Sequence, residues 1–264
     1  MIPPGPGEVR LRRALAPLSF PFIEERSIKF SPGRASADRL LLSFVARSLD
    51  PDRKSSLSAV TLQLGLTPED AGQLIELVDH AETVHFGAEH DREIALKLYL
   101  EFPVGAVLPA LVPPGTIFFA AKWVSGGRAT FSIYRDLPDV RAATTIRGFA
   151  QALTPSLALR DFLDSVLAGA APTVPDYGLP TMEVVDLGTA RRSIDVNLYG
   201  ASVRLAALQV ALGRLAVGLA VPAAGLAAAL PASGDPFLGH VSLGHGRDGE
   251  PFATVYFGAV ARPA

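Results

Sequence analysis

Lysine and tyrosine side chains alternate with apolar ones in one segment of this chain, a pattern that suits the lining of a binding cavity. In residues 94–102 the even positions carry Ile, Leu or Phe, whereas the odd positions include Lys97, Tyr99 and Glu101. Successive side chains of a strand point to opposite faces, so the segment predicts a strand with one apolar and one polar face. If such strands close into a barrel, the polar faces line its interior and the apolar faces require helices outside.

Several cations are expected at equivalent inward positions. Alternation along the first strand places Glu25 and Lys29 on one face, Lys97 and Lys122 occupy matching positions of two later hairpins, and Arg39 is expected in the first turn of a helix. A single charge of this kind is usually solvated or locally paired. Several fixed cations inside one barrel repel each other unless an anion binds between them, and a diphosphate fits that need.

Tyrosines provide the second inward group, because an aromatic face attracts cations. A ring of tyrosines could therefore shelter a carbocation that forms when a diphosphate ester ionises, although each ring could also simply fill the barrel. The inward-facing tyrosines are Tyr99, Tyr134, Tyr199 and Tyr256. Asn197 and His240 are also expected on inward-facing strand positions. Asn197 is assigned to the pocket lining and His240 to the residues that bind the diphosphate.

The elements that must position these residues are four hairpins separated by helical sequence. Residues 21–30 alternate as a strand, and a helix is expected over 36–45, with Ser36 as its cap and Arg39 in its first turn. A further helix is expected to begin at Thr67. The expected hairpins and later helical regions occupy residues 82–102, 116–138, 140–167, 181–200, 203–230 and 237–258. The order predicts an α+β fold, either an open sandwich or a closed antiparallel barrel ringed by helices. The inward tyrosines and sparse lysines favour the closed barrel.

Composition limits the classes of function. The chain has 264 residues, a net charge of −2 and no cysteine, so disulfides and thiolate chemistry are excluded and no global field favours nucleic acid. Residues 1–15 are expected to be a flexible lead-in without a secretion signal. Residues 203–230 are mostly apolar, but charges and Pro222 interrupt them, which favours two packed helices over a membrane span. We expect a cytoplasmic, single-domain protein over residues 1–264.

Four segments of this chain resemble the peptide prenyltransferases of cyanobactin biosynthesis, which have the ABBA prenyltransferase barrel. The segments are residues 23–44, 85–102, 190–200 and 239–257. The resemblance implies an antiparallel barrel of about ten strands surrounded by helices. It also implies transfer of a dimethylallyl or longer group, such as geranyl, from its diphosphate to a nucleophilic side chain of a ribosomal peptide, linear or macrocyclic. It leaves open which side chain or terminus accepts the group.

The resemblance also assigns roles to residues. In that family a glutamate on the first strand acts as a base or orients the acceptor. Glu25 matches this glutamate, and Glu24 is the alternative if the register shifts by one residue. The diphosphate-binding arginine matches Arg39, and a strand lysine matches Lys97; Lys29, Lys122 and His240 follow from inward parity. Magnesium is implied as an ion bound through the phosphate oxygens of the donor.

Two other interpretations remain at this stage. A related barrel could prenylate a small aromatic metabolite instead of a peptide. A catalytically silent barrel could bind a peptide without any donor, and replacement of Arg39 or Lys97 would then leave its function intact.

Overall fold

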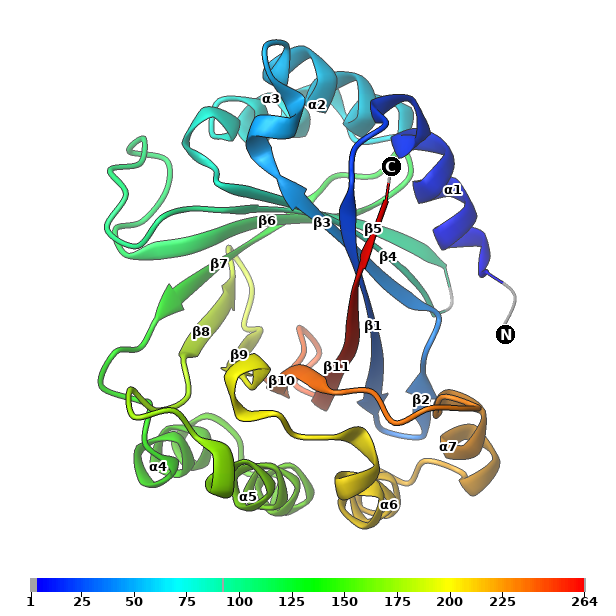
Figure 1. Ribbon diagram of the computed structural model, residues 1–264, viewed down its shortest axis with the longest axis vertical. Helices are drawn as coiled ribbons and strands as arrows, with labels where there is room; N and C mark the ends of the chain where they lie inside the picture. The colour runs from blue at the N-terminus through cyan, green and yellow to red at the C-terminus, as the bar shows by residue number, and fades with distance from the viewer. Residues whose placement is uncertain (1–3, 92, 264) are drawn as a thin grey trace. The chain divides into compact units, whose positions relative to one another are not determined.

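The chain alternates antiparallel hairpins with helices, as the computed structural model shows for residues 4–91 and 93–263. The strands are β1 (Phe22–Ser31), β2 (Arg34–Ser36), β3 (Arg39–Val45), β4 (Thr83–His90), β5 (Ile94–Glu101), β6 (Thr116–Val124), β7 (Thr130–Asp136), β8 (Thr181–Asp186), β9 (Arg192–Asn197), β10 (Leu238–His245) and β11 (Pro251–Arg262). The helices are α1 (Pro6–Leu15), α2 (Arg53–Gln63), α3 (Pro68–Ile75), α4 (Ala143–Leu153), α5 (Leu157–Ala170), α6 (Gln209–Gly218) and α7 (Ala223–Ala229). Figure 1 labels these elements.

Hydrogen bonds join the described strands into one sheet that returns to its start. The order is β11-β10-β9-β8-β7-β6-β5-β4-β3-β1-β2, and β11 also pairs with β1. Strand β2 is a three-residue return that pairs with β1. The remaining ten strands therefore form a closed antiparallel barrel, and the predicted α+β barrel is confirmed.

The chain divides into two compact units. Within the described residues, the first unit is drawn from Met1–Glu25, Asp38–Arg135 and Val260–Ala264, and the second from Arg26–Ala37 and Asp136–Ala259. Each unit contains part of the sheet and its own helices. The predicted single domain over residues 1–264 stays a prediction.

In the first unit, helices cover one face of the sheet. Helix α1 contacts β4 and β5, and α2 packs against α1 and α3 on the same side (Figure 1). Leu96, Leu98 and Leu100 of β5 are completely buried on this apolar face. The alternate positions of β3–β7 point the other way and form what we call the polar face: Arg39, Ser43, His85, Glu89, Lys97, Tyr99, Glu101, Phe118, Lys122 and Tyr134.

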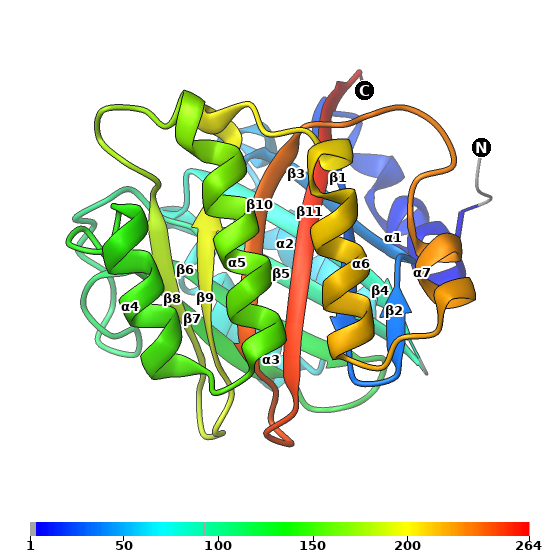
Figure 2. The same cartoon turned by 90° about the horizontal axis from the view of Figure 1, so that it is seen from below.

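In the second unit, α4, α5 and α6 lie side by side across β8–β11 (Figure 2). Their apolar side chains join those of the strands in one core that includes Ile28, Ile194 and Leu243. The apolar segment 203–230 contains α6 and α7, as predicted, and Pro222 immediately precedes α7. No helix within the described residues has the length and hydropathy needed to cross a membrane.

Two sequence predictions about local structure need correction, and one helix lies where none was predicted. Residues 39–45, expected in a helix capped by Ser36, form strand β3; Leu40, Leu42 and Phe44 are buried with the period of a strand, and hydrogen bonds to β4 fix it. The lead-in contains α1, whose Leu11 and Ala14 are buried, and residues 1–3 lie outside the described residues. Helix α2 was not predicted.

Candidate functional site

Four charged side chains meet on the polar face of the first unit: Arg39, Glu89, Lys97 and Lys122. Arg39 lies opposite Glu89 across β3 and β4, and Lys97 lies opposite Lys122 across β5 and β6. Lys97 Nζ is 2.8 Å from Glu89 Oε2, and Arg39 and Lys122 contact the same carboxylate. The side chains of Arg39 and Glu89 are each 7% exposed, whereas that of Lys122 is 37% exposed, so the cationic cluster is buried at Arg39 and Glu89 and reaches water at Lys122.

The cationic cluster contains more cationic side chains than carboxylates. Arg39, Lys97 and Lys122 all contact one carboxylate, that of Glu89. Burial alone would raise the pKa of Glu89, but Arg39, Lys97 and Lys122 outweigh it and hold that pKa well below 4.5. Burial lowers the pKa of Lys97 well below 10.5, and the two other cations lower it further, against the opposing effect of Glu89. A multiply charged anion suits such a group of cationic side chains.

Aromatic rings line the polar face beside the cationic cluster. Tyr99 follows Lys97 by two residues and therefore shares its face. The Tyr99 and Tyr134 ring centroids are 6.0 Å apart, and those of Phe118 and Tyr134 are 5.5 Å apart. The imidazole of His85 lies 5.7 Å from the Phe118 ring and 6.3 Å from the Tyr99 ring. These four residues, His85, Tyr99, Phe118 and Tyr134, form what we call the aromatic cluster.

The two glutamates of β1 have different surroundings. Glu24 accepts a hydrogen bond from Arg12 at 2.8 Å and lies 3.4 Å from Arg262. Glu25 is 3% exposed, and strand alternation places it on the face opposite Glu24. Arg12 belongs to α1, so Glu24 faces the helix side and Glu25 has the inward parity predicted for it.

The second unit contains the remaining predicted residues. His240 Nδ1 lies 2.9 Å from Asp195 Oδ2, and its ring stacks on Tyr256 with centroids 3.7 Å apart. Lys29 Nζ lies 5.2 Å from the centroid of the Phe252 ring. The roles predicted for Lys29, His240 and Tyr256 stay predictions.

Tyr199 departs from its predicted place. It lies after the end of β9 in a short 3-10 turn and is 51% exposed, so the expected strand position is wrong. The reason is that β9 ends at Asn197, whose side-chain oxygen accepts a hydrogen bond from the Tyr199 backbone N–H. The ring centroid of Tyr199 is 6.3 Å from that of His240, and the role of Tyr199 in the pocket stays a prediction. Asn197 itself is half-buried at the end of the strand, and its pocket-lining role stays a prediction.

Sequence reasoning missed Glu89, His85 and Glu101. The register of the first hairpin would have pointed to His85 and Glu89. His85 lies opposite Tyr99, and Gly87 lies opposite Lys97. Glu89 is two residues after Gly87 and therefore lies on the same face as Lys97. The sequence placed Glu101 on the same strand face as Lys97 and Tyr99, but it offered no reason to give this glutamate a role.

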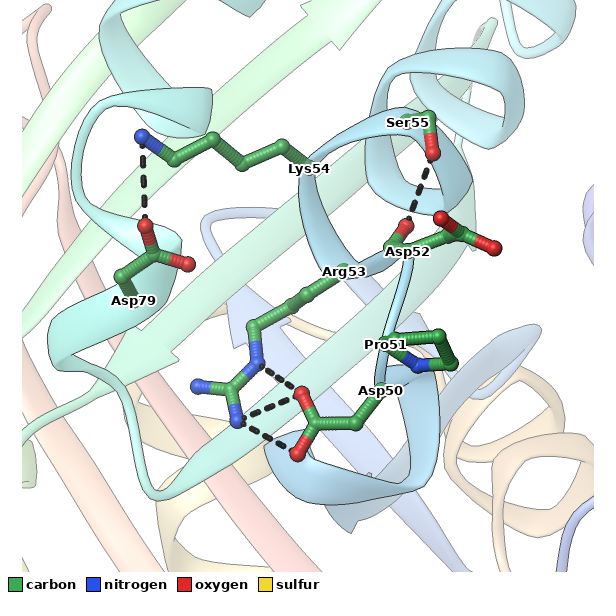
Figure 3. A pocket seen from close by; sticks show the side chains of 7 residues that line it. All are labelled: Asp50, Pro51, Asp52, Arg53, Lys54, Ser55 and Asp79. Carbon is green, nitrogen blue, oxygen red and sulfur yellow. Dashed lines mark hydrogen bonds and ion pairs between the residues drawn. The ribbon is translucent and has the colours of Figure 1, made fainter.

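A surface depression in the first unit lies around the start of α2. It has a volume of about 520 Å³ and is lined by Asp50, Pro51, Asp52, Arg53, Lys54, Ser55 and Asp79 (Figure 3). Its cations are paired with neighbouring acids: Arg53 with Asp50 at 2.9 Å, and Lys54 with Asp79 at 3.2 Å. The acids of both pairs and Lys54 are exposed, and each cation has its own acid, so the depression does not gather several cations around one buried carboxylate as the cationic cluster does.

The donor set of the cationic cluster does not fit a protein-held magnesium ion. Magnesium prefers carboxylate and water oxygens, whereas the one carboxylate of the cluster, Glu89, is already bound by three cations. Within the described residues, no group of three or more His, Cys, Asp or Glu side chains is placed to hold a metal. The magnesium expected from the sequence would be bound through the phosphate oxygens of the donor, and it stays a prediction.

Comparisons with known proteins bear on the fold. No protein-family model and no curated protein matches the chain. The 5-dimethylallyltryptophan synthase from Streptomyces coelicolor is similar in structure, with 18% identity, a TM-score of 0.58 and coverage of 89% of this chain and 80% of that one. The prenyltransferase PriB, solved with L-tryptophan and dimethylallyl thiolodiphosphate, has 16% identity and a TM-score of 0.63, with coverage of 91% of this chain and 81% of that one. The 6-dimethylallyltryptophan synthase from Micromonospora olivasterospora has 18% identity and a TM-score of 0.56, with coverage of 89% of this chain and 81% of that one.

These similarities identify the class of fold. The chain has the barrel of the ABBA aromatic prenyltransferases, as the resemblance to that fold predicted. The structures named above bind or are named for tryptophan, and the predicted peptide acceptor stays a prediction.

Proposed function

We propose that this chain is a prenyltransferase that moves a dimethylallyl group, or a longer one such as geranyl, from its diphosphate to an electron-rich acceptor. The observation that carries the proposal is the position of the cationic cluster beside the aromatic cluster on one face of one sheet. A diphosphate ester needs both environments at once, because its head is anionic and its allylic tail becomes cationic as the ester ionises.

Each cluster has a separate part in the proposed reaction. Arg39, Lys97 and Lys122 neutralise the diphosphate, so that the C–O bond breaks and its electron pair leaves with the phosphate oxygen. The faces of Tyr99 and Tyr134 stabilise the allylic cation and limit its contact with water. The acceptor then forms a bond to the allylic carbon and loses a proton.

The indole of tryptophan is the proposed acceptor, either as the free amino acid or within a peptide. Free tryptophan is favoured by the likeness to PriB, which was solved with L-tryptophan and a donor analogue. Peptide tryptophan is favoured by the resemblance of four segments to cyanobactin-type enzymes. Glu25 is proposed to orient this acceptor, because it is buried with inward parity while Glu24 is held by Arg12.

Calorimetry with dimethylallyl and geranyl diphosphate tests the donor site. Loss of charge-assisted hydrogen bonds costs about 1.5–3 kcal/mol each, so Arg39→Ala and Lys97→Ala should weaken donor binding by about 10- to 100-fold. Lys54→Ala is the matched control, since Lys54 pairs with Asp79 on the surface and its loss should leave the affinity unchanged.

Acceptor assays by mass spectrometry follow, with L-tryptophan and a tryptophan-containing cyclic peptide in competition. Wild-type protein that binds neither donor would overturn the proposal and favour a silent binding barrel. Donor binding with prenylation of a different small aromatic compound would overturn the choice of acceptor but not of reaction.

A further inference from the structure

A hydrogen-bonded chain of three side chains crosses the polar face of the first unit beside the aromatic cluster. The hydroxyl of Ser43 lies 2.7 Å from His85 Nδ1, and His85 Nε2 lies 3.1 Å from Glu101 Oε2. Strand register explains the arrangement, because Ser43 lies opposite His85 and His85 opposite Tyr99, with Glu101 one pleat beyond Tyr99. A hydroxyl, an imidazole and a carboxylate in this order can carry a proton in one direction.

The carboxylate determines the direction of the chain. Burial alone would raise the pKa of Glu101, but hydrogen bonds from His85 and Thr83 lower it overall, so Glu101 is ionised and can only accept. His85 Nε2–H therefore donates to Glu101, which leaves Nδ1 of the neutral ring to accept from the Ser43 hydroxyl. The Glu101 side chain is 34% exposed and that of His85 is 14% exposed, so the proton has a route towards water.

The chain also lies beside the rings that are proposed to stabilise the allylic cation. The His85 ring is itself part of the aromatic cluster, and Tyr99 separates it from the cationic cluster along β5. The other charged or titratable side chains of this face on β3–β7 are Arg39, Glu89, Lys97, Tyr99, Lys122, Tyr134 and Asp136; Glu25 of β1 shares their inward parity.

We propose that Ser43, His85 and Glu101 form the proton relay that accepts the proton of the prenylated acceptor. The inference rests on the proposed prenyl transfer. As the acceptor bonds to the allylic carbon and the diphosphate leaves, the acceptor proton passes to Ser43 Oγ while the Ser43 hydroxyl proton passes to His85 Nδ1. The resulting imidazolium is stabilised by Glu101 and afterwards releases its proton to water. Glu25 orients the acceptor and the relay removes the proton.

Steady-state kinetics with dimethylallyl diphosphate and L-tryptophan test the relay. General-base catalysis contributes about 10²–10⁴-fold to a rate, so Ser43→Ala and His85→Gln should lower kcat by about that factor and leave the KM for the donor within about two-fold. The matched control is His245→Gln, because His245 contacts a backbone carbonyl in the second unit and should behave as wild type.

Nitrogen NMR of the histidines gives a readout independent of turnover. The relay requires the neutral His85 ring to be protonated at Nε2, and a ring protonated at Nδ1 would overturn it. Undiminished kcat in His85→Gln would overturn the relay alone, and an equal loss of donor binding and kcat would show a structural role instead. If wild-type protein binds the donor but forms no prenylated tryptophan, the relay is overturned for this acceptor. If wild-type protein does not bind the donor, the proposed function is overturned as well.

Discussion

Lys97 and Lys122 lie directly opposite each other in the register of β5 and β6, and both side chains reach the carboxylate of Glu89. Like charges in opposite positions destabilise a sheet, so this part of the barrel depends on an anion between the two lysines. Glu89 supplies that anion, and the proposed diphosphate would add to it when the donor binds.

Replacement of Glu89 by glutamine should destabilise the protein strongly. Breaking a buried charge network by removing one partner costs about 3–5 kcal/mol, because Arg39 and Lys97, which are largely buried, lose the carboxylate that they contact. Urea unfolding at neutral pH measures the change. Glu69→Gln is the control, since the exposed Glu69–Arg128 pair should contribute less than about 1 kcal/mol. A similarly small effect of Glu89→Gln would contradict the prediction.

The stability that Glu89 provides should depend on pH. Its pKa is held well below 4.5 in the folded protein, where Arg39, Lys97 and Lys122 outweigh the effect of burial. A group with a lowered folded pKa stabilises the fold fully above its unfolded pKa, and this stability is lost as the pH falls towards the folded value. The difference in unfolding free energy between wild type and Glu89→Gln should therefore shrink below about pH 4.5. A constant difference down to about pH 3 would argue against this.

Removal of divalent metal should leave donor binding nearly unchanged. The reason is that the charge needed by the diphosphate comes from Arg39, Lys97 and Lys122, while the carboxylate beside them is already bound. Calorimetry with dimethylallyl diphosphate in excess EDTA should give an affinity within about two-fold of that in magnesium. Loss of binding in EDTA that magnesium restores would contradict this and support the magnesium predicted from the sequence.

Gly87 should be sensitive to side chains of any size above alanine. A Cβ at this position would lie 3.3 Å from Lys97 Cβ, so the branched side chain of Gly87→Val would push Lys97 away from Glu89. We expect donor affinity to fall by about tenfold. Gly148→Ala in α4 meets no atom within 4 Å and serves as the control. Unchanged affinity in Gly87→Val would show that Lys97 does not need its present position.

Alternation and turn residues were sufficient to predict the hairpins, because glycines such as Gly126 mark the turn and side-chain parity follows directly. The same argument predicted that Lys97 and Lys122 share a face. It failed at residues 39–45, where three successive leucines fit both a helical stripe and a strand, and only pairing with β4 decides between them. Local sequence contains no information about such a partner.

The composition of the site depended on contacts between distant segments. Glu89 lies 50 residues after Arg39 and gains its role from a register that cannot be read along one strand. Ser43 and Glu101 likewise meet at His85 only once β3, β4 and β5 are paired. The sequence therefore predicted the cations and tyrosines of the first unit, but neither the carboxylate that holds the cations nor the hydrogen-bonded chain beside the rings.

Trp123 occupies the opposite side of β6 from Lys122 and is the one tryptophan of the chain. It is 2% exposed, and its indole N–H donates to the Leu64 carbonyl oxygen between α2 and α3. Its fluorescence should therefore be blue-shifted in the folded protein and should report when these helices separate from the sheet. Since the second unit has no tryptophan, the emission of tryptophan, excited selectively over that of tyrosine, is an optical signal of the first unit alone. The unfolding of the first unit can therefore be followed without any label.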